Sequence, residues 1–408
     1  MSLQVSVGIN EGDDAHAVGA NACQDALSKL GSGSPGESSI VPDLAIVFSS
    51  VKYDQEKMLA GVRSVSKNAL LVGSSTAGEI TTQGPSRKSS VAVMLIKSPE
   101  IKFYAAAGEN IKDGAREAGK VVAEEVKKMA GGTLNAFMML PDVLVGNGAD
   151  IVRGVLDSLG EHFPVVGGAS GDDFKFEKTY QYLNDKVYSG AVIGLGLVGN
   201  FKIGIGVKHG WLPVGIPMKV TKSEGAVLHE LDGKPAINIY RDYFGAEEAK
   251  KLQQETLAKL AITYPLGMTV AGSDEMLIRD PITVNEQGSI TCAAEIPEGS
   301  EIRLMVGSRE EAVKVAKEAA EKAVEQLEGT VPKAVIIFNC IARSKLFGER
   351  SGEEITAIQE AVGAETPLIG FYTYGEQAPL GGEVRNIEKC NSAFHNETVV
   401  ICVLGEKN

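Results

Sequence analysis

The stretch Pro367-Leu-Ile-Gly-Phe-Tyr-Thr-Tyr-Gly-Glu376 is the part of the sequence from which the fold can be worked out. It begins as a short apolar strand, then places a threonine and two tyrosines between two glycines, and ends on a glutamate. Leu71-Val-Gly-Ser-Ser-Thr-Ala-Gly-Glu79 repeats this layout with the same glycine spacing and the same final acid. Val165-Val-Gly-Gly-Ala-Ser-Gly-Asp172 is a third, shorter copy. We call these three stretches the first (71–79), second (165–172) and third (367–376) glycine turns.

The surroundings of the glycine turns repeat as well. An apolar strand lies about thirty residues before each turn, a helical stretch lies in between, and another apolar strand follows the turn. A repeated unit of this length indicates that a whole lobe has been duplicated. The strands before the turns are residues 44–48, 136–140 and 334–338, and those after them are residues 91–96, 190–197 and 399–404.

Two long helices are predicted between these strands. Residues 112–129 carry apolar side chains on one face, and Gly131 and Gly132 can end the helix. In the second half, Ser308 and Glu311 form a capping box that starts a helix ending at Gly329. The predicted buried face of this second helix consists of Ala312, Val315, Ala316, Ala319, Ala323 and Leu327.

Neighbouring strands are predicted to form two antiparallel pairs with tight turns between them. Turn-forming residues separate the strands of each pair. Gly204 and Gly206 leave one face of the last strand bare, which lets a side chain or a ligand approach its backbone. The two pairs are residues 91–107, turning at Ser98-Pro99, and residues 191–207, turning at Gly199-Asn200.

Together these elements predict an α/β fold of the mixed α+β kind. We expect two lobes of mixed β-sheet, internally duplicated and flanked by helices, with the domains at residues 1–212 and 213–408. Two sheets stacked between helical layers, an αββα sandwich, is one arrangement that fits this pattern.

Composition narrows the class of protein. A chain of 408 residues can bury two or three cores, and a formal charge of −13 without a basic tract argues against a nucleic-acid partner. The N-terminus does not resemble a secretory signal and no apolar run approaches eighteen residues, so we expect a cytoplasmic protein without membrane insertion. The five widely spaced cysteines fit a reducing compartment and exclude a cysteine-based zinc site. They are Cys23, Cys292, Cys340, Cys390 and Cys402.

Known cofactor-binding motifs are either absent from the sequence or lack the secondary structure that they need around them. Residues 194–199 match GxGxxG, but a strand follows them instead of the helix N-terminus that a dinucleotide needs. The sequence has no Walker A motif, no HExxH and no GxSxG. We therefore predict no cofactor and no metal site.

Several individual residues can be interpreted either as functional or as structural. Cys340 ends an apolar strand, where clefts open, and Arg343 could lower the pKa of its thiol and make it a nucleophile. A free cysteine in this position is otherwise a small hydrophobic side chain. Arg279 forms either a surface ion pair or an inward contact to an anion. Of the five histidines, His209 and His395 are the two worth testing, and Trp211 is expected in the core.

The glycine turns can be interpreted as ligand-binding sites or as purely structural turns. Short side chains let backbone N–H groups converge on a carboxylate, while the following acid can accept from an ammonium group. Alternatively, each glycine only permits a positive φ and the acid caps the turn. For the first two turns both interpretations stay open. For the third, with Tyr372, Tyr374 and Glu376 together, we favour a pocket.

Three stretches of the second half resemble a known family. Residues 338–343 (Phe-Asn-Cys-Ile-Ala-Arg), the third glycine turn and residues 394–398 (Phe-His-Asn-Glu-Thr) look like the C-terminal FIST domain, of the F-box and intracellular signal transduction proteins. Residues 44–79 and 166–172 resemble its N-terminal half, so the resemblance covers about nine-tenths of the chain. The sequence departs from the family's pattern near Asn339 and Ala342 and at Glu397, which bears on ligand choice.

The resemblance implies a sensory domain of bacterial signalling that binds small ligands such as amino acids. Relatives are often joined to kinase, cyclase or chemoreceptor modules. For this chain we expect output through a separate partner protein or through a change in homo-oligomeric state.

We predict that a zwitterionic metabolite bridges the two lobes. Arg343 or Arg279 would bind its carboxylate, and Glu376 or Asp172 its ammonium group. The competing hypotheses are a hydrolase or transferase that uses Cys340, and a scaffold without a ligand. The predicted ligand-binding residues are Gly78, Glu79, Ser170, Asp172, Arg279, Asn339, Cys340, Arg343, Tyr372, Thr373, Gly375, Glu376 and Asn396.

Overall fold

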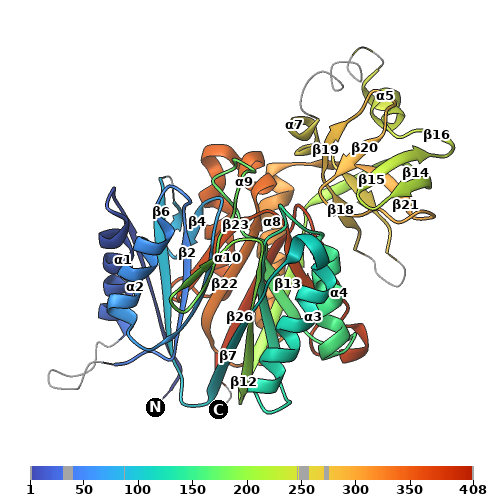
Figure 1. Cartoon of the computed structure of the whole chain (residues 1–408). Coiled ribbons are helices and arrows are strands. Elements are labelled where there is room, and N and C mark those ends of the chain that lie inside the picture. The colour runs from blue at the N-terminus through green and yellow to red at the C-terminus, as the bar shows by residue number, and fades with distance from the viewer. Residues whose placement is uncertain are drawn as a thin grey trace.

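Four β-sheets and their covering helices make up the protein, as predicted for a mixed α/β fold (Figure 1). The computed structural model describes residues 2–30, 40–86, 88–245, 247, 257–270 and 275–406. Three six-stranded sheets form the main body, and the fourth sheet projects from its upper end in Figure 1, away from the two chain termini. Within the described residues, each helix is too short or too polar to cross a bilayer.

The first sheet has the strand order β1-β6-β2-β3-β10-β11. Only β2 and β3 run parallel, as their helical connection requires. Two helices, α1 (Ala15–Leu30) and α2 (Gln55–Ser66), pack on its outer face. The strands are β1 (Gln4–Glu11), β6 (Ser90–Lys97), β2 (Leu44–Ser49), β3 (Leu70–Ser75), β10 (Gln181–Leu183) and β11 (Lys186–Tyr188).

The second sheet repeats this plan in the order β7-β12-β8-β9-β24-β25. Here β8 and β9 are parallel, and helices α3 (Ile111–Met129) and α4 (Gly148–Leu159) cover the outer face. The strands are β7 (Ile101–Gly108), β12 (Val192–Gly199), β8 (Ala136–Pro141), β9 (Val165–Gly168), β24 (Glu376–Pro379) and β25 (Ser392–His395).

The third sheet has the order β13-β26-β22-β23-β4-β5, with β22 and β23 parallel. Its helices are α8 (Arg309–Glu325), α9 (Ile341–Phe347) and α10 (Ser351–Val362). The whole predicted apolar face of α8, from Ala312 to Leu327, is buried. The strands are β13 (Phe201–Lys208), β26 (Val399–Glu406), β22 (Pro332–Cys340), β23 (Leu368–Thr373), β4 (Glu79–Thr81) and β5 (Gly84–Pro85).

The three sheets are three copies of one unit, so the duplication inferred from the sequence is a triplication. Each copy contributes four strands to its own sheet and sends the hairpin or strands after its glycine turn to another sheet: β4-β5 join the third sheet, β10-β11 the first and β24-β25 the second. This exchange interlocks the sheets around one shared apolar core. The second and third sheets mix strands from residues 1–212 with strands from residues 213–408. The division into two domains at that point stays a prediction.

The predicted pairing of consecutive strands is wrong at both tight turns. Strand β6 pairs with β1 and β2, whereas β7 pairs with β12; likewise β12 pairs with β7 and β8, whereas β13 pairs with β26. The chain uses these turns to pass from one sheet to the next. Turn residues mark where the chain reverses, but they do not show which strand becomes the hydrogen-bonding neighbour.

One glycine in the first strand of each copy lets a helix backbone rest directly on the sheet. A Cβ atom would lie 2.2 Å from Ala22 O at Gly8, 2.2 Å from Ala118 O at Gly108 and 1.8 Å from Ala319 O at Gly206. A Cβ atom at Gly204 would likewise meet Ala323 O at 1.8 Å. The group that approaches the bare face predicted at Gly204 and Gly206 is therefore helix α8.

Replacing Gly206 by alanine is expected to destabilise the protein by about 1–3 kcal/mol or more, because α8 must move away from β13 to admit the methyl group. Gly352 provides a matched control, since a Cβ atom there meets open space in the first turn of α10 and alanine favours helix. Urea denaturation midpoints of Gly206→Ala and Gly352→Ala would compare the two. Equal stability of both variants would contradict the close packing.

Residues 211–307 form the fourth sheet, which is inserted between β13 and α8. It has its own core, with helices α5 (Asn238–Phe244) and α7 (Ala258–Ala261). Trp211 is buried against Ile278 and Met305, in the core position predicted for it. The strands are β14 (Trp211–Glu224), β15 (Val227–Leu231), β16 (Lys234–Pro235), β17 (Leu266–Met268), β18 (Leu277–Arg279), β19 (Pro281–Val284), β20 (Ile290–Cys292) and β21 (Glu301–Gly307).

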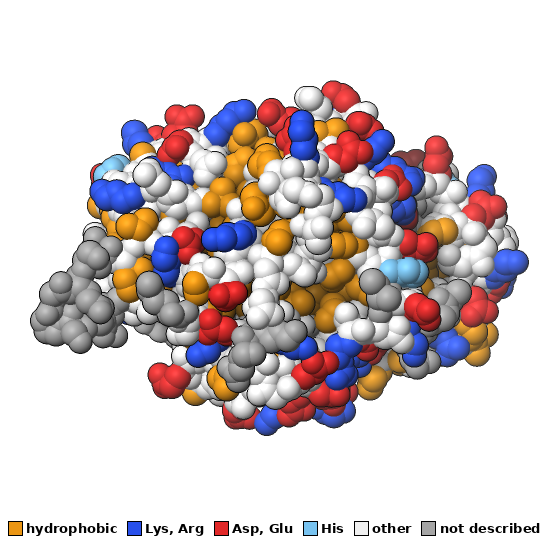
Figure 2. Space-filling view, turned by 90° about the horizontal axis from the view of Figure 1, so that it is seen from below, with side chains coloured by type: hydrophobic (Ala, Val, Ile, Leu, Met, Phe, Trp, Pro, Cys, Tyr) orange, Lys and Arg blue, Asp and Glu red, His pale blue; other side chains and the backbone are white. Residues whose placement is uncertain are grey.

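The surface at the lower end of the main body carries charges of both signs. Figure 2 shows lysine and arginine side chains interspersed with aspartate and glutamate on this face, together with scattered apolar side chains. The face seen there has no extended basic area of the kind that binds a phosphate backbone.

Candidate functional site

The three glycine turns lie against one another in the structure. Each turn follows the C-terminal end of the third strand in its copy of the repeated unit, and backbone hydrogen bonds join every pair of turns. The contacts are Gly171 N to Ser75 O (2.9 Å), Ala77 N to Tyr372 O (2.9 Å) and Ala169 N to Gly375 O (2.8 Å). The turns therefore fill much of the space between them with their own backbone.

The first and third turns have the same backbone design. Gly78 has φ +130° and Gly375 has φ +154°, values that suit glycine. The N–H of each glycine donates to the threonine two residues before it, Thr76 or Thr373, at 3.2 Å in both turns. The need for a positive φ thus accounts for the glycine in both turns. Whether a turn also binds a ligand depends on the acid that follows its glycine.

In the first turn the acid is fully partnered. Glu79 is buried, and Thr76 Oγ1 donates to its Oε1 at 2.5 Å while Ser90 Oγ donates to its Oε2. Burial raises the pKa of Glu79 to about 7. Because both oxygens are occupied by the protein, Glu79 has the features of a structural residue.

In the third turn the corresponding acid is left open on one side. Glu376 is fully buried, and Thr398 donates to its Oε2 through Oγ1 (2.7 Å) and through N (3.1 Å). Thr373, the counterpart of Thr76, donates instead to Ala169 O at 2.7 Å. Apart from the neighbouring Cys340 thiol, Glu376 Oε1 has no partner. Burial raises the pKa of Glu376 to about 8.

Two further acids belong to the same buried region, because the charges of both Glu376 and Asp280 act on Glu397. Glu397 is fully buried with both carboxylate oxygens unpartnered, and its φ of +58° is strained for a glutamate. Asp280, at the corner between β18 and β19 of the fourth sheet, has a buried Oδ1 without a partner. Burial, followed by the charges of Asp280 and Glu376, raises the pKa of Glu397 well above its usual range, and burial raises that of Asp280 to about 7. We call Asp280, Glu376 and Glu397 the carboxyl cluster.

Unpartnered buried acceptors cost about 1–3 kcal/mol each, so native proteins seldom keep several together without a functional reason. Across the described ranges, no group of three His, Cys, Asp or Glu side chains is arranged to hold a metal ion. The carboxyl cluster therefore has the acceptors of a binding site but not the geometry of a metal centre.

Cys340 lies beside the carboxyl cluster but is poorly suited to act as a nucleophile. It is 5% exposed, and burial together with the charges of Glu376 and Glu397 raises the pKa of its thiol well above the usual value. Arg343 does not reverse this effect. The thiol is therefore protonated at neutral pH, whereas a nucleophile must be a thiolate.

We expect Cys340 to react slowly with a thiol reagent in the folded protein. All five cysteines are buried, so the folded chain should show no rapidly alkylated thiol, and full labelling should appear only in denaturant. Iodoacetamide labelling followed by peptide mass spectrometry measures each site separately. Rapid labelling of Cys340 alone in the native protein would support the enzyme hypothesis instead.

Arg343 holds three helices together from inside the protein. It is fully buried, its Nε donates to Glu354 Oε1 at 2.8 Å, and its Nη2 donates to Ala312 O at 2.9 Å. Its Nη1 donates to His209 O. Asn339 donates to the other oxygen of Glu354 at 2.7 Å. These bonds already occupy the groups that were predicted to receive a ligand carboxylate.

Arg279 faces inward, which excludes a surface ion pair, but its hydrogen bonds in the described structure go to backbone carbonyl oxygens. It is 3% exposed, its Nε donates to Glu295 O at 2.7 Å and its Nη1 donates to Ile278 O at 2.9 Å. Burial lowers its pKa to about 10. His395 is buried and His209 is half-buried. Desolvation lowers the pKa of each to about 4, so both are neutral at pH 7.

The second glycine turn is organised as a cap. The Asp172 carboxylate accepts backbone N–H groups from residues 175–178 and the hydroxyl of Tyr374. Ser170 Oγ accepts from Gln181 at 3.0 Å. Tyr374 stacks on Phe176 with ring centroids 4.5 Å apart. In this turn the acid stabilises a loop, which is the capping alternative.

The structure thus divides the predicted site residues. Cys340, Arg343 and Glu376 lie together with the carboxyl cluster, whereas Glu79 and Asp172 belong to separate, satisfied networks. Asn396 Oδ1 and the Tyr372 hydroxyl are buried without partners. The sequence interpretation missed Asp280 and did not assign Glu397 to the site, although Glu397 stood out as a departure from the family's pattern.

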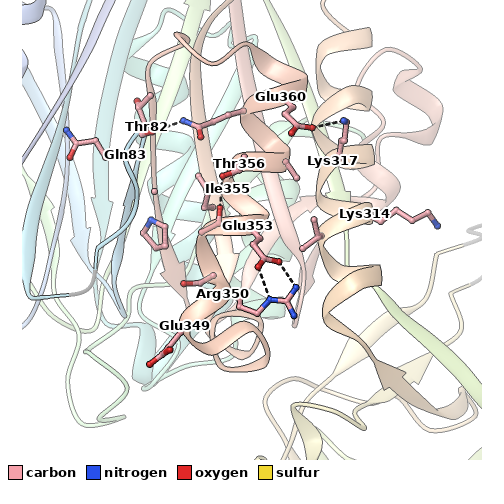
Figure 3. A pocket seen from close by; sticks show the side chains of 17 residues that line it. Thr82, Gln83, Lys314, Lys317, Glu349, Arg350, Glu353, Ile355, Thr356 and Glu360 are labelled. Atoms are coloured by element: carbon pink, nitrogen blue, oxygen red, sulfur yellow. Dashed lines mark hydrogen bonds and ion pairs between the residues drawn. The ribbon is translucent and has the colours of Figure 1, made fainter.

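A surface groove of about 710 Å³ lies apart from these residues (Figure 3). It runs between α8, α10 and the β4–β5 hairpin, and two ion pairs form among the side chains that line it. Lys317 pairs with Glu360 at 2.8 Å and Arg350 with Glu353 at 2.7 Å. None of the predicted ligand-binding residues lines this groove.

The chain is similar to several proteins of known sequence and to several solved structures. An uncharacterized protein of Mycobacterium tuberculosis strain H37Rv is 24% identical over 393 residues, covering 93% of this chain and 96% of that protein. One from Methanocaldococcus jannaschii is 27% identical over 341 residues, covering 75% and 64%. Similar solved structures include a chorismatase (TM-score 0.38, 8% identity, 99% of both chains) and a cyanuric acid hydrolase from A. caulinodans (TM-score 0.41, 9% identity, 100% of both chains).

Two family profiles cover most of the sequence. The FIST N domain matches residues 43–234, and the FIST C domain matches residues 236–379. The carboxyl cluster joins the second matched region, which contains Asp280 and Glu376, to Glu397 close behind it. The chain therefore belongs to the FIST family of sensory domains in signal transduction.

Proposed function

We propose that the protein is a cytoplasmic sensor that binds a small polar metabolite at the carboxyl cluster. The observation that carries this proposal is the set of buried carboxylate oxygens without partners on Asp280, Glu376 and Glu397. The first glycine turn serves as an internal comparison, because its acid, Glu79, has the same backbone setting and no open oxygen.

An ammonium group fits these open oxygens. An amino-acid-like ligand would place its ammonium among the three carboxyl groups, where each charge-assisted hydrogen bond contributes roughly 1.5–3 kcal/mol. Micromolar affinity requires about 8 kcal/mol, so burial of the rest of the ligand must supply part of the free energy. Two arginines were predicted to bind a ligand carboxylate. Of these, Arg279 has an Nη2 that makes no hydrogen bond to the protein in the described structure.

The three acids belong to different parts of the fold, and this links ligand binding to a signal. Glu376 and Glu397 belong to the three-sheet body, while Asp280 belongs to the fourth sheet. A ligand held by all three would fix the fourth sheet against the body, a change of the hinge type that a separate partner protein or a second copy of the chain could detect.

A ligand screen by thermal shift tests this function. A metabolite present at a hundredfold its dissociation constant should stabilise the protein by about 2.7 kcal/mol. Glu376→Gln should abolish the shift, and Glu79→Gln should retain it, since Glu79 is the matched acid outside the cluster. If no amino acid, amine or other polar metabolite raises the melting temperature, the protein is not a sensor of this class.

A further inference from the structure

We infer that the ligand of the carboxyl cluster is a cationic amine without a carboxylate, such as an alkyl diamine, and not a zwitterion or a metal ion. This inference rests on the proposed small-ligand function and names the chemical class of the ligand. It is carried by the kind of atoms left open, by the charges around them and by the geometry of the three acids.

Every open atom of the cluster is a carboxyl or amide oxygen, and each of them accepts hydrogen bonds when the acids are ionised. Glu376 contributes Oε1, Glu397 contributes both carboxylate oxygens, and Asp280 contributes Oδ1. The neighbouring Asn396 adds an unpartnered Oδ1 although its side chain is only 2% exposed. A matching ligand must therefore supply donors, and a primary ammonium supplies three from a single charged centre.

The charges around the cluster favour a cation. Arg343 acts on both Glu376 and Glu397, but it is bound to Glu354 in a fully buried pair and its charge is thereby balanced. His395 lies in the same region and is neutral. A carboxylate brought among the three acids would be repelled by their ionised forms, and the two nearby arginines are already engaged: Arg343 pairs with Glu354, and Arg279 donates to the Glu295 and Ile278 carbonyl oxygens. An ammonium group would be attracted by all three ionised acids.

A metal ion is disfavoured by geometry. A hard cation such as Ca²⁺ or Mg²⁺ needs its oxygen ligands within about 2.0–2.6 Å of one point. In the part of the chain that the structure describes, no three acidic, histidine or cysteine side chains are arranged in this way.

Binding of a cation should release protons. The groups that face the cluster or act on its charges come from every element packed around it: Cys340 on β22, Arg343 on α9, Glu354 on α10, His395 on β25, Tyr240 on α5, Cys292 on β20, and the three acids themselves. Buried carboxyl groups whose pKa values are raised hold protons near neutral pH. An ammonium ligand favours their ionised form, so affinity should increase as pH rises from 6 to 8.

Isothermal titration calorimetry with matched probes tests the inference. The probes are n-butylamine, 1,4-diaminobutane, 4-aminobutanoate and CaCl₂, each titrated into the full-length protein at pH 6.5 and pH 8. We expect 1,4-diaminobutane to bind at least tenfold more tightly than 4-aminobutanoate, which has the same length but ends in a carboxylate. Its affinity should be higher at pH 8.

Three variants assign the binding to the cluster. Glu397→Gln and Asp280→Asn should each weaken 1,4-diaminobutane at least tenfold, while Glu79→Gln should leave it unchanged; circular dichroism confirms that each variant is folded. Tighter binding of 4-aminobutanoate or of Ca²⁺ would overturn the amine inference and leave a small-ligand sensor standing. Amine binding that is insensitive to both cluster variants would also overturn it. Absence of binding by these probes and by the amino acids of the thermal screen would overturn the proposed function as well.

Discussion

Replacing Glu354 by alanine should destabilise the protein by about 3–5 kcal/mol, because it leaves the Arg343 guanidinium charged in a fully buried position. The pair is also the point where several elements meet. Arg343 donates to Glu354 on α10, to Ala312 O on α8 and to His209 O before the fourth sheet, while Asn339 on β22 donates to Glu354. Loss of Glu354 thus removes the partner of two buried side chains at once.

A double replacement separates the charge effect from the packing effect. Arg343→Met combined with Glu354→Leu should recover much of the stability lost in Glu354→Ala, since apolar side chains of similar volume avoid the buried unpaired charge. Chemical denaturation of the wild type, both single variants and the double variant measures the coupling between the two positions. Single variants as stable as the wild type would show that the pair is not the buried link described here.

The second large effect is a loss of stability as pH rises. Burial raises the pKa of Glu376 to about 8 and raises that of Glu397 well above its usual range, while both groups have ordinary values near 4.5 when unfolded. The stabilisation from a raised carboxyl pKa is complete below the unfolded value and is lost as pH rises through the folded value. Between pH 5 and pH 8, each of the two groups should therefore lower the free energy of unfolding by up to about 1.4 kcal/mol per pH unit.

Variants identify the source of this slope. Glu397→Gln cannot ionise, so it should flatten the pH dependence and make the ligand-free protein more stable than the wild type at pH 8. Glu79 also has a raised pKa, and Glu79→Gln measures its separate contribution. Urea denaturation at half-unit steps from pH 5 to pH 8.5 would show the slopes. A wild-type stability that stays constant or increases over this range would contradict ionisable groups buried without partners.

Repetition was the feature that the sequence revealed most reliably. The three glycine turns, the strands on either side of them and the apolar face of α8 are local patterns, and each is found where it was predicted. Which sheet a strand joins depends on partners that lie far away in the chain, such as β4 beside β23. For this reason the exchange of strands among the three sheets could not be predicted from turn residues.

The candidate site was only partly predictable for the same physical reason. Glu376 was found because it ends a glycine turn, but its open oxygen depends on Thr373 donating to Ala169, two residues that are 204 positions apart. Asp280 reaches the site from an inserted sheet. The left-handed backbone of Glu397 is unusual for a glutamate, so no local rule points to it. Arg343 matched the pattern of an anion-binding residue, yet Glu354, eleven residues later, already occupies it.

A crystal structure of the protein soaked in 1,4-diaminobutane at pH 8 tests the central claim most directly. The account predicts an ammonium nitrogen within hydrogen-bonding distance of Glu376 Oε1 and of a Glu397 oxygen, with Asp280 turned toward the same ligand. Ligand density only in the groove between α8 and α10, or a cluster in which the three carboxyl groups bond to one another with no ligand between them, would contradict it.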